Sequence, residues 1–405
     1  ATVPEKMEKM KKDFGANWSS NLEKALVKNL EVNGTVLTLR NGFPMAGYQN
    51  IDCSGHYPDD PRIPKLKAMY DANILRVMHQ VHYQTAGNKS LDLVFFINGI
   101  PVATAEVKTE LTQTVHDAIE EYQTQRKPIE AGTNRKNYLL MYKRGAVVHF
   151  AISEDEIWMN TNLEGDKPKF LPFNKGTEDG HQGNPKSESD TDYPTSYFWH
   201  DICHRENWIR IFHDFIFESI SKKEDATGRI REFRTQLFPR FHQWNCITKC
   251  INDVKKNGVG QRYLIEHSAG SGKTETISWT AHELINIRKD NGDKLFSSVI
   301  VVTDRVGLDS NIKGTIKQLK KTAGLIAMIG GDEKKSATAK NKELADALRN
   351  RREIIVVTLQ TFPYALDAIT KDDTLAGSNF AVLIDEAHSS QTGEFAGKMK
   401  AALKK

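Results

Sequence analysis

The second half of the chain carries three short and nearly continuous apolar runs, at residues 298–305, 353–358 and 380–384. Stretches with helical periodicity separate these runs. Strands that are apolar on both faces are typical of a parallel sheet covered by helices on both sides. The pattern therefore predicts an α/β domain with a parallel sheet, which begins near Phe233.

The first half has a different pattern, in which shorter helical and strand-like segments alternate. An apolar stripe indicates a helix over residues 1–35, with a break at Asn33-Gly34. The other predicted elements are a surface loop at 47–62, a helix at 63–75, strands at 76–83, 137–142, 146–152 and 156–160, and a helix at 114–126. Together they predict a small domain with a mixed α/β fold.

A long connection is predicted between the two halves. Residues 161–196 are rich in Gly, Pro, Asn, Asp and Ser. Residues 199–221 then have the spacing of an amphipathic helix with several aromatic side chains. We interpret these side chains as core or domain packing, against the alternative of a platform on which bases stack.

Two apolar runs on either side of Asn98-Gly99 predict a β-hairpin in the first half. Glu106 and Lys108 are two residues apart on its second strand, so they share a face. A two-residue loop would pair residue 92 with residue 105 and send Asp92 and Glu106 to opposite faces. A three-residue loop, 98–100, would pair residue 92 with residue 106. We predict that loop or an equivalent bulge, because Pro101 cannot donate to a ladder.

Two carboxylates and a lysine at one point suit metal-assisted hydrolysis of a phosphodiester. Asp92 and Glu106 would hold Mg²⁺, which prefers oxygen ligands. Lys108 would orient the attacking water or help to deprotonate it. The alternative is a surface hairpin with ordinary charges. The site is favoured because these charges interrupt runs that are otherwise nearly all apolar.

A phosphate-binding loop is predicted in the segment YLIEHSAGSGKTETISW. The apolar run 263–265 would be a strand, the small residues would form a loop, and a helix would follow. Such a loop cradles phosphates with backbone N–H groups at the helix N-terminus. His267 stands where the motif has its first glycine. The residues expected to contact ATP and its Mg²⁺ are Gly270, Ser271, Gly272, Lys273 and Thr274, with Lys273 on the phosphates and Thr274 on the metal.

Acidic residues follow the apolar run 380–384 directly. The carboxyl ends of strands in an open parallel sheet form the ligand-binding edge. Asp385 would therefore reach the Mg²⁺ held by Thr274, usually through water, and Glu386 would polarise the attacking water. A phosphate-binding loop and this acidic pair together predict an ATPase.

Composition sets limits on the class of protein. The chain has 405 residues, of which 39% are hydrophobic and 27% charged, as is ordinary for a globular protein. Its net charge of +4 is too small to indicate nucleic-acid binding by itself. The four cysteines show no C-x-x-C spacing, and no apolar run approaches the ~20 residues that span a bilayer. We expect a reduced, cytoplasmic protein that is neither exported nor membrane-bound.

Several motifs resemble those of one known family. HSAGSGKT, VIVVTDR, VVTLQTF and IDEAHSSQ resemble motifs I, Ia, Ib and II of superfamily 2 helicases, the last of which includes His388. FPRFHQ resembles the Q motif that reads adenine, with Gln243 as its glutamine. With the hairpin LDLVFFINGIPVATAEVK upstream, the whole chain is similar to the restriction (motor) subunit of type I restriction–modification enzymes.

This resemblance implies an architecture and an activity. A restriction-endonuclease-like domain of the PD-(D/E)xK class would occupy residues 1–160, a linker and connecting helix 161–230, and the first RecA-like helicase lobe 231–405. Asp92, Glu106 and Lys108 would be the nuclease triad. The enzyme would be a type I site-specific deoxyribonuclease that cleaves double-stranded DNA with Mg²⁺ and translocates on it with ATP. Separate methylation and specificity subunits would be its partners.

The chain also departs from the family pattern. Many members carry Q-x-x-x-Y in the helix after the triad, where this chain has Tyr122 but Ala118 at the glutamine position. For the acidic residue that the family carries on its first helix, the candidate in this chain is Glu23. The sequence ends 17 residues after His388, before motifs III to VI and the second lobe, so we expect no translocation by these residues alone.

Two other functions are compatible with parts of the pattern. One is a helicase-like ATPase of DNA repair or remodelling, whose N-terminal domain binds DNA without cutting it. Convergence of Asp92, Glu106 and Lys108 would argue against it. The other is an assembly module that docks on a methyltransferase through residues 161–196 and the helix at 199–221.

Overall fold

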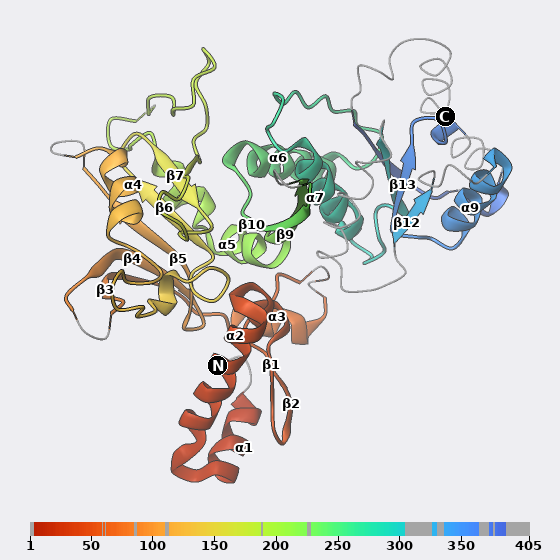
Figure 1. The fold of residues 1–405 in the computed structure, drawn as a ribbon. Helices are drawn as coiled ribbons and strands as arrows, with labels where there is room; N and C mark the ends of the chain where they lie inside the picture. Colours follow the sequence, from red (N-terminus) through yellow and green to blue (C-terminus); the bar gives the residue numbers. More distant parts are fainter. Residues whose placement is uncertain are drawn as a thin grey trace. The chain divides into compact units, whose positions relative to one another are not determined.

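A computed structural model describes residues 4–58, 60, 62–84, 87–109, 113–187, 189–224, 228–303, 326–329, 336–363, 372–375 and 377–385 (Figure 1). The chain forms two compact units. The first comprises Ala1–Ile216 and Gln236–His242, and the second comprises Phe217–Thr235 and Gln243–Lys405. The limits of the three segments inferred from sequence stay a prediction.

The first unit is built on a six-stranded mixed sheet. Its strands, in spatial order, are β3 (Leu75–His82), β4 (Ser90–Ile97), β5 (Ile100–Val107), β6 (Val148–Ile152), β7 (Ile157–Asn160) and β8 (Leu171–Pro172). β5 and β6 run parallel, and the other neighbours run antiparallel. The predicted mixed sheet is therefore confirmed, and β8 adds a strand inside the segment predicted to be a connection.

The helix α4 (Val115–Thr124) joins the two parallel strands. It begins at Thr114 with a capping box, in which Thr114 and Asp117 satisfy each other's backbone N–H groups. Its apolar side chains, including Ala118 and Tyr122, pack in one core cluster with Leu91 and other residues of the sheet. The spacing predicted this helix at 114–126, and the structure confirms it.

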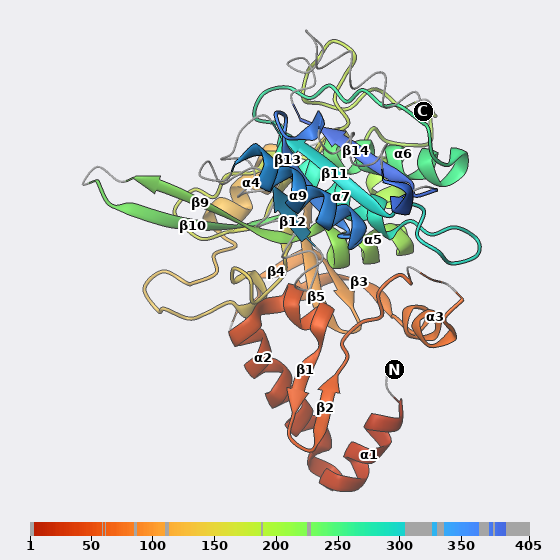
Figure 2. The same cartoon turned by 90° about the vertical axis from the view of Figure 1, so that its right-hand side faces the viewer.

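Helices and a hairpin precede the sheet. They are α1 (Pro4–Phe14), η1 (Gly15–Asn17), α2 (Trp18–Asn41), β1 (Phe43–Met45), β2 (Tyr48–Ile51) and α3 (Pro64–Asp71). Figure 2 shows α1, α2 and the β1–β2 hairpin side by side. The predicted break at Gly34 is a kink with φ 77°, where a Cβ atom would lie 2.8 Å from the carbonyl oxygen of Lys143. The helix continues beyond it to Asn41.

Two predictions for this unit are wrong. Residues 47–62 are not simply a surface loop, because they include β2 and a buried stretch in which Gly55 packs against the backbone of Met69. Residues 137–142 form no strand. Tyr138–Leu140 is a 3₁₀ turn (η2), and the chain reverses so tightly that Ala146 N–H donates to the Leu139 carbonyl.

Apart from Trp199, which is 39% exposed, the aromatic side chains of the segment lie in the core. The segment consists of η3 (Phe198–Ile202), α5 (Arg205–Arg210) and η4 (Ile211–Phe215), so the predicted single helix over 199–221 is wrong beyond Phe215. A strand begins at Phe217, since the backbone becomes extended at Ile216. Trp208 and Phe212 are buried, with ring centroids 5.1 Å apart. The interpretation as core packing is confirmed, and this burial argues against a docking surface there.

A parallel sheet organises the second unit. Its strands, in spatial order, are β12 (Ile326–Ile329), β13 (Ile354–Thr358), β11 (Ser298–Thr303) and β14 (Phe380–Ile384). All neighbouring strands run parallel, as predicted. The remaining elements are β9 (Phe217–Glu224), β10 (Ile230–Leu237), α6 (Phe241–Asn257), α7 (Lys273–Asn286), α9 (Ala337–Arg349) and η5 (Asp373–Leu375).

Helices lie on both sides of this sheet (Figure 1). Leu344 and Leu348 of α9 pack with Ile300 and Val357 in one core cluster. The helix α7 contacts β11, β13 and β14, and none of its residues belongs to that cluster. The prediction of a parallel sheet covered on both faces is therefore confirmed.

The strand predicted at 263–265 does not form. Tyr263, Leu264 and Ile265 are 44%, 71% and 41% exposed, and the described sheet ends at β14. The Tyr263 hydroxyl donates to Asp253 of α6, 2.6 Å away. The segment therefore lies outside the described sheet and contacts α6 through its first residue.

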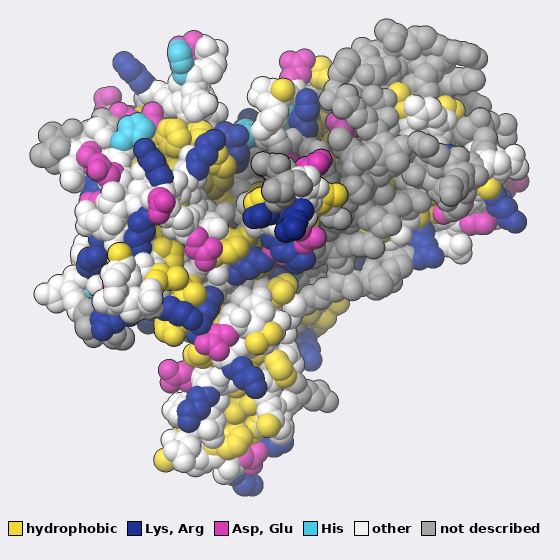
Figure 3. Space-filling view, in the orientation of Figure 1, with side chains coloured by type: hydrophobic (Ala, Val, Ile, Leu, Met, Phe, Trp, Pro, Cys, Tyr) yellow, Lys and Arg dark blue, Asp and Glu magenta, His cyan; other side chains and the backbone are white. Residues whose placement is uncertain are grey.

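Charges of both signs are interspersed on the face of the protein seen in Figure 3. This mixture agrees with the small net charge of the sequence. Within the described part of the chain, no helix has both the length and the apolar character needed to cross a membrane.

Candidate active site

A β-bulge brings Asp92 opposite Glu106. The turn between β4 and β5 has two residues, since Ile97 pairs with Ile100. The register then shifts next to Phe96, so that one extra residue enters β5 and Leu93 pairs with Ala105. Continued by one step, this register sets Asp92 opposite Glu106, where the Asp92 carboxylate accepts a hydrogen bond from the Val107 N–H. The predicted bulge is confirmed, and the three-residue loop is not formed.

Asp92 is held at both of its carboxylate oxygens. Its Oδ2 accepts a hydrogen bond from the Val107 N–H at 2.9 Å. Its Oδ1 accepts one from Nε2 of Gln80 on β3 at 3.1 Å. The carboxylate therefore has a fixed orientation at the edge of the hairpin, although the residue is only half-buried.

Glu106 is fully buried and only partly neutralised. Its Oε1 accepts a hydrogen bond from Nε of Arg126 at 2.7 Å. Its Oε2 accepts none from any residue that the structure describes. Burial raises the pKa of Glu106 to about 8, against the lowering effect of Arg126 and with a smaller upward contribution from Asp92. With Arg126 as the cation beside it, Glu106 therefore keeps its proton up to about that pH unless a further positive charge takes the place of the proton.

A divalent cation fits this requirement. Among the described residues, no group of three or more His, Cys, Asp or Glu side chains is placed to hold a metal ion. Mg²⁺ often takes only one or two protein carboxylates and completes its coordination with water and phosphate oxygens. Asp92 and Oε2 of Glu106 supply that donor set, so these residues fit the metal that the sequence implies.

Lys108 is connected to Glu106 by ion pairs through Glu121 and Arg126, two residues that were not predicted from the sequence. Its Nζ lies 2.6 Å from Oε1 of Glu121 on α4, and the side chain is 10% exposed. The other oxygen of Glu121 lies 3.3 Å from Nη2 of Arg126, which holds Glu106. The structure therefore brings Asp92 and Glu106 together directly, and connects Lys108 to them in a chain of alternating charges.

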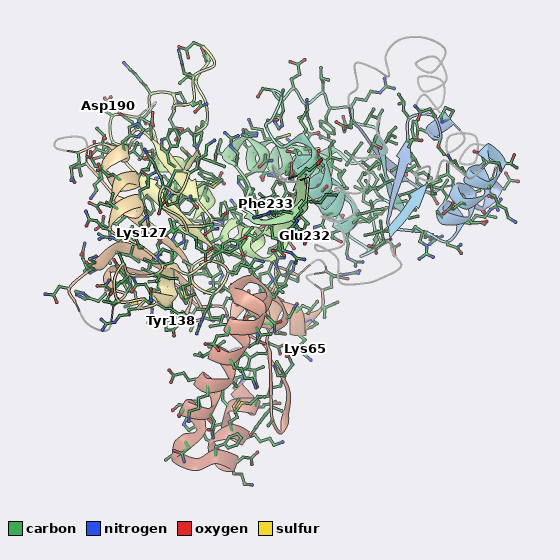
Figure 4. All side chains as sticks on the ribbon, viewed as in Figure 1. Lys65, Lys127, Tyr138, Asp190, Glu232 and Phe233 are labelled. Atoms are coloured by element: carbon green, nitrogen blue, oxygen red, sulfur yellow. The ribbon has the colours of Figure 1, made fainter. Side chains whose placement is uncertain are left out.

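A sequence signal for Glu121 and Arg126 existed but was weak. Both lie close to Tyr122 in the sequence, at the end of the helix that packs against β5. Arg126 turns inward, whereas the neighbouring Lys127 (Figure 4) donates to the backbone carbonyls of Gly165 and Asp166. Only the docking of α4 on the sheet distinguishes these two cations.

Tyr122 supports the site from behind. It is fully buried, and its hydroxyl is 2.8 Å from Oγ1 of Thr104, which in turn is 2.8 Å from Nδ1 of His149. Burial lowers the pKa of His149 to about 3, so this imidazole is neutral at physiological pH. These neutral groups pack beneath the hairpin.

Glu23 does not occupy a comparable position. It is exposed on α2 and borders a shallow surface pocket of about 570 Å³. All the residues that line this pocket belong to α2: Ser20, Glu23, Lys24, Val27, Lys28 and Glu31.

The predicted nucleotide loop ends in a left-handed glycine. Gly272, with φ 85°, precedes α7, and its carbonyl accepts a hydrogen bond from Nε2 of Gln243 at 3.0 Å. A Cβ atom on Gly272 would lie 2.5 Å from that nitrogen. Gln243 and Gly272, both predicted to contact the nucleotide, are therefore in contact at the loop although they are 29 positions apart in the sequence. Gly270 also has a positive φ, and Ser271 N–H donates to the Ser268 carbonyl in a turn.

Lys273 and Thr274 begin α7, where backbone N–H groups are available to an anion. Burial lowers the pKa of His267, and the nearby positive charge of Lys273 lowers it further. His267 therefore adds a neutral side chain to this loop at physiological pH.

Asp385 follows β14 at the carboxyl end of the sheet. Its N–H donates to the Val302 carbonyl of β11 at 2.9 Å, which continues the ladder by one residue. Glu386 and His388 lie outside the described residues.

Two parts of the chain match the models of known protein families. Residues 59–168 match the family model of the type I restriction enzyme R protein N terminus, and residues 242–405 match that of the SWI2/SNF2 ATPase. The first match contains the hairpin with Asp92 and Glu106. The second contains the predicted phosphate-binding loop and β14.

Two curated proteins of Methanocaldococcus jannaschii are similar to most of the chain. One, assigned as the endonuclease subunit of the type I restriction enzyme MjaVIIIP, is 25% identical over 351 residues. The other, assigned as the endonuclease subunit of MjaIXP, is 22% identical over 347 residues. The matches cover 80% of this chain but 30% and 29% of those proteins, so the chain spans less than a third of their length. Both family domains stand in this order on one chain, and the chain is similar to the endonuclease subunits of type I restriction enzymes over most of its length.

Proposed function

We propose that the β4–β5 hairpin is the catalytic site of an Mg²⁺-dependent DNA endonuclease. The observation that carries the proposal is that the Asp92 and Glu106 carboxyl groups interact across the hairpin, while Oε2 of Glu106 is buried and accepts no hydrogen bond from the described residues. Burying the Glu106 carboxylate beside the half-buried Asp92 is costly unless positive charge neutralises both groups. A structural role alone would be served better by an apolar pair at this position of the ladder.

Each residue of the site has a distinct proposed role. Asp92 and Oε2 of Glu106 hold the metal, and Arg126 anchors Oε1 so that Oε2 stays available. The bound ion would supply the charge that stabilises the phosphorane-like transition state and the leaving oxygen. Lys108, held by Glu121, orients the attacking water or helps to take its proton.

The second unit is proposed to be an ATP-driven motor on double-stranded DNA. Lys273 neutralises the phosphates, Thr274 and Asp385 hold Mg²⁺, and Glu386 polarises the attacking water. Gln243 recognises the adenine. Its hydrogen bond to the Gly272 carbonyl connects the adenine site to the phosphate-binding loop. The match to the SWI2/SNF2 ATPase supports this role.

The similarity to type I endonuclease subunits supports a set of partners. We propose that the protein acts in the cytoplasm with separate methylation and specificity subunits, which supply the recognised sequence. Cleavage would then follow translocation, at a distance from that sequence.

Cleavage of plasmid DNA by the complete restriction complex tests the nuclease assignment. Mg²⁺-dependent cleavage and ATP hydrolysis are measured in parallel for the wild type, Asp92→Ala and Lys108→Ala. The exposed residues Asp190 and Lys65 (Figure 4) provide matched controls as Asp190→Ala and Lys65→Ala.

We expect both site variants to lose cleavage by at least about 10²-fold while ATP hydrolysis survives, since the two chemistries use different residues. The controls should cleave normally. Normal cleavage by Asp92→Ala would mean that the hairpin carries ordinary charges, and the function as a repair-type ATPase would then be favoured.

A further inference from the structure

Gln80 has an unusual backbone for its position. It lies inside β3, yet its φ is 51°, in the left-handed region that a residue with a Cβ atom rarely adopts. The other non-glycine residues with positive φ in the described part of the chain lie outside strands: Asn98, Asn134, Lys143 and Arg351. Strained residues of this kind persist only where the surrounding structure fixes them, and they cluster at active sites and ligand-binding sites.

The side chain of Gln80 is directed at the nuclease hairpin. The register places it opposite Asp92, because His79 pairs with Leu93 and Val81 pairs with Leu91. Its Nε2 donates to Oδ1 of Asp92 at 3.1 Å. Its Oε1 accepts a hydrogen bond from Oγ of Ser90 at 2.8 Å, which fixes the orientation of the amide.

These contacts complete the support of Asp92. The Val107 N–H holds Oδ2, and the Gln80 amide holds Oδ1. Neither donor carries a charge, so both orient the carboxylate without placing a competing cation beside it. Groups that orient a metal ligand in this way commonly change metal affinity or activity by about 10–100-fold when they are removed.

We propose that Gln80 is a positioning residue of the nuclease site, whose strained backbone aims its amide at Asp92 and sets the carboxylate for the metal. This inference rests on the proposed nuclease function. The competing explanation is that Gln80 only ties the edge strand β3 to β4, in which case its removal would loosen the fold and affect the site through stability alone.

Two substitutions separate these explanations. Gln80→Ala and Gln80→Gly both remove the amide, but only glycine adopts φ 51° without strain. Isothermal titration of the 405-residue chain with Mn²⁺ measures metal binding, and thermal unfolding without metal measures stability. Asp92→Ala reports the loss of the metal ligand itself, and Ser90→Ala removes only the group that orients the amide.

We expect both Gln80 variants to bind Mn²⁺ at least about tenfold more weakly than the wild type. Gln80→Gly should nevertheless unfold at a higher temperature than Gln80→Ala, by about 2–4 °C. Ser90→Ala should weaken binding only a few-fold. Metal affinity would then follow the amide, while stability follows the backbone strain.

Two results would overturn the inference in distinguishable ways. If Asp92→Ala abolishes Mn²⁺ binding but both Gln80 variants bind as the wild type does, Gln80 has no positioning role and the nuclease assignment stands. The same holds if the glycine variant regains affinity along with stability. If Asp92→Ala itself binds Mn²⁺ normally, the proposed metal site fails and the inference fails with it.

Discussion

The hairpin proposed as the nuclease site and the loop predicted to bind phosphate differ in how they accommodate charge. At the hairpin, charged side chains are placed within buried strands and compensate one another through Arg126, Glu121 and Lys108. At the loop, the backbone around Gly272 and the N-terminus of α7 offer uncharged N–H groups. Metal binding at the hairpin should therefore depend on the ion pairs between side chains and on the protonation of Glu106. Anion binding at the loop should depend on the backbone conformation around Gly272.

The largest expected effect separates the two sites. Lys273→Ala should lower ATP hydrolysis by about 10²–10³-fold, because it removes the charge that neutralises the phosphates. Mn²⁺ binding at the hairpin should not change. A parallel loss of ATP hydrolysis in Lys273→Ala and Asp92→Ala would show that the two sites are one functional unit, which would break the comparison.

Metal binding at the hairpin should depend strongly on pH. The pKa of Glu106 is about 8 in the folded protein, so the metal must displace a proton below that pH. The Mg²⁺ concentration for half-maximal cleavage should therefore fall by up to about tenfold per unit as the pH rises from 6 to 8, and then level off. ATP hydrolysis, measured alongside, should not follow this profile. A flat Mg²⁺ requirement over this range would contradict a buried, protonated Glu106.

The pH dependence of the free energy of unfolding gives an independent measure of the protonation of Glu106. The folded protein binds the Glu106 proton up to pH near 8, whereas the unfolded chain releases it above its ordinary pKa of 4.5. The free energy of unfolding without metal should thus fall by no more than a few kcal/mol as the pH rises through this window. Glu106→Gln should remove that slope.

The smallest expected effect concerns the residue between the two cations. Glu121→Gln removes the charge that holds Lys108 and Arg126, and should lower cleavage by about tenfold with unchanged ATP hydrolysis. Glu121→Asp should restore part of the activity because it restores the charge. Glu120→Gln, on the exposed face of the same helix, is the matched control. Equal effects at both positions would assign the loss to the helix rather than to Lys108.

Local patterns predicted more of the second unit than of the first. Continuous apolar runs predicted β11, β13 and β14, since buried parallel strands are apolar on both faces. The run at 263–265 failed because apolarity alone does not ensure a partner strand. β12 has only four residues and was not predicted.

At the hairpin, the requirement that Asp92 and Glu106 meet was enough to predict a bulge. Glu121 and Arg126 could not be predicted, because their roles depend on how α4 packs on the sheet. The strained Gln80 is likewise invisible in a strand pattern, since φ follows from contacts across the ladder rather than from the residue type.

The central claim is that Asp92 and Glu106 share one metal ion. Crystals of the chain soaked in Mn²⁺ test it directly, through the anomalous scattering of manganese. The account predicts a peak between Asp92 and Oε2 of Glu106, at about 2.0–2.3 Å from each oxygen. It also predicts that Arg126 stays on Oε1. A well-ordered hairpin without such a peak, or with Arg126 spanning both carboxylates in its place, would contradict the claim.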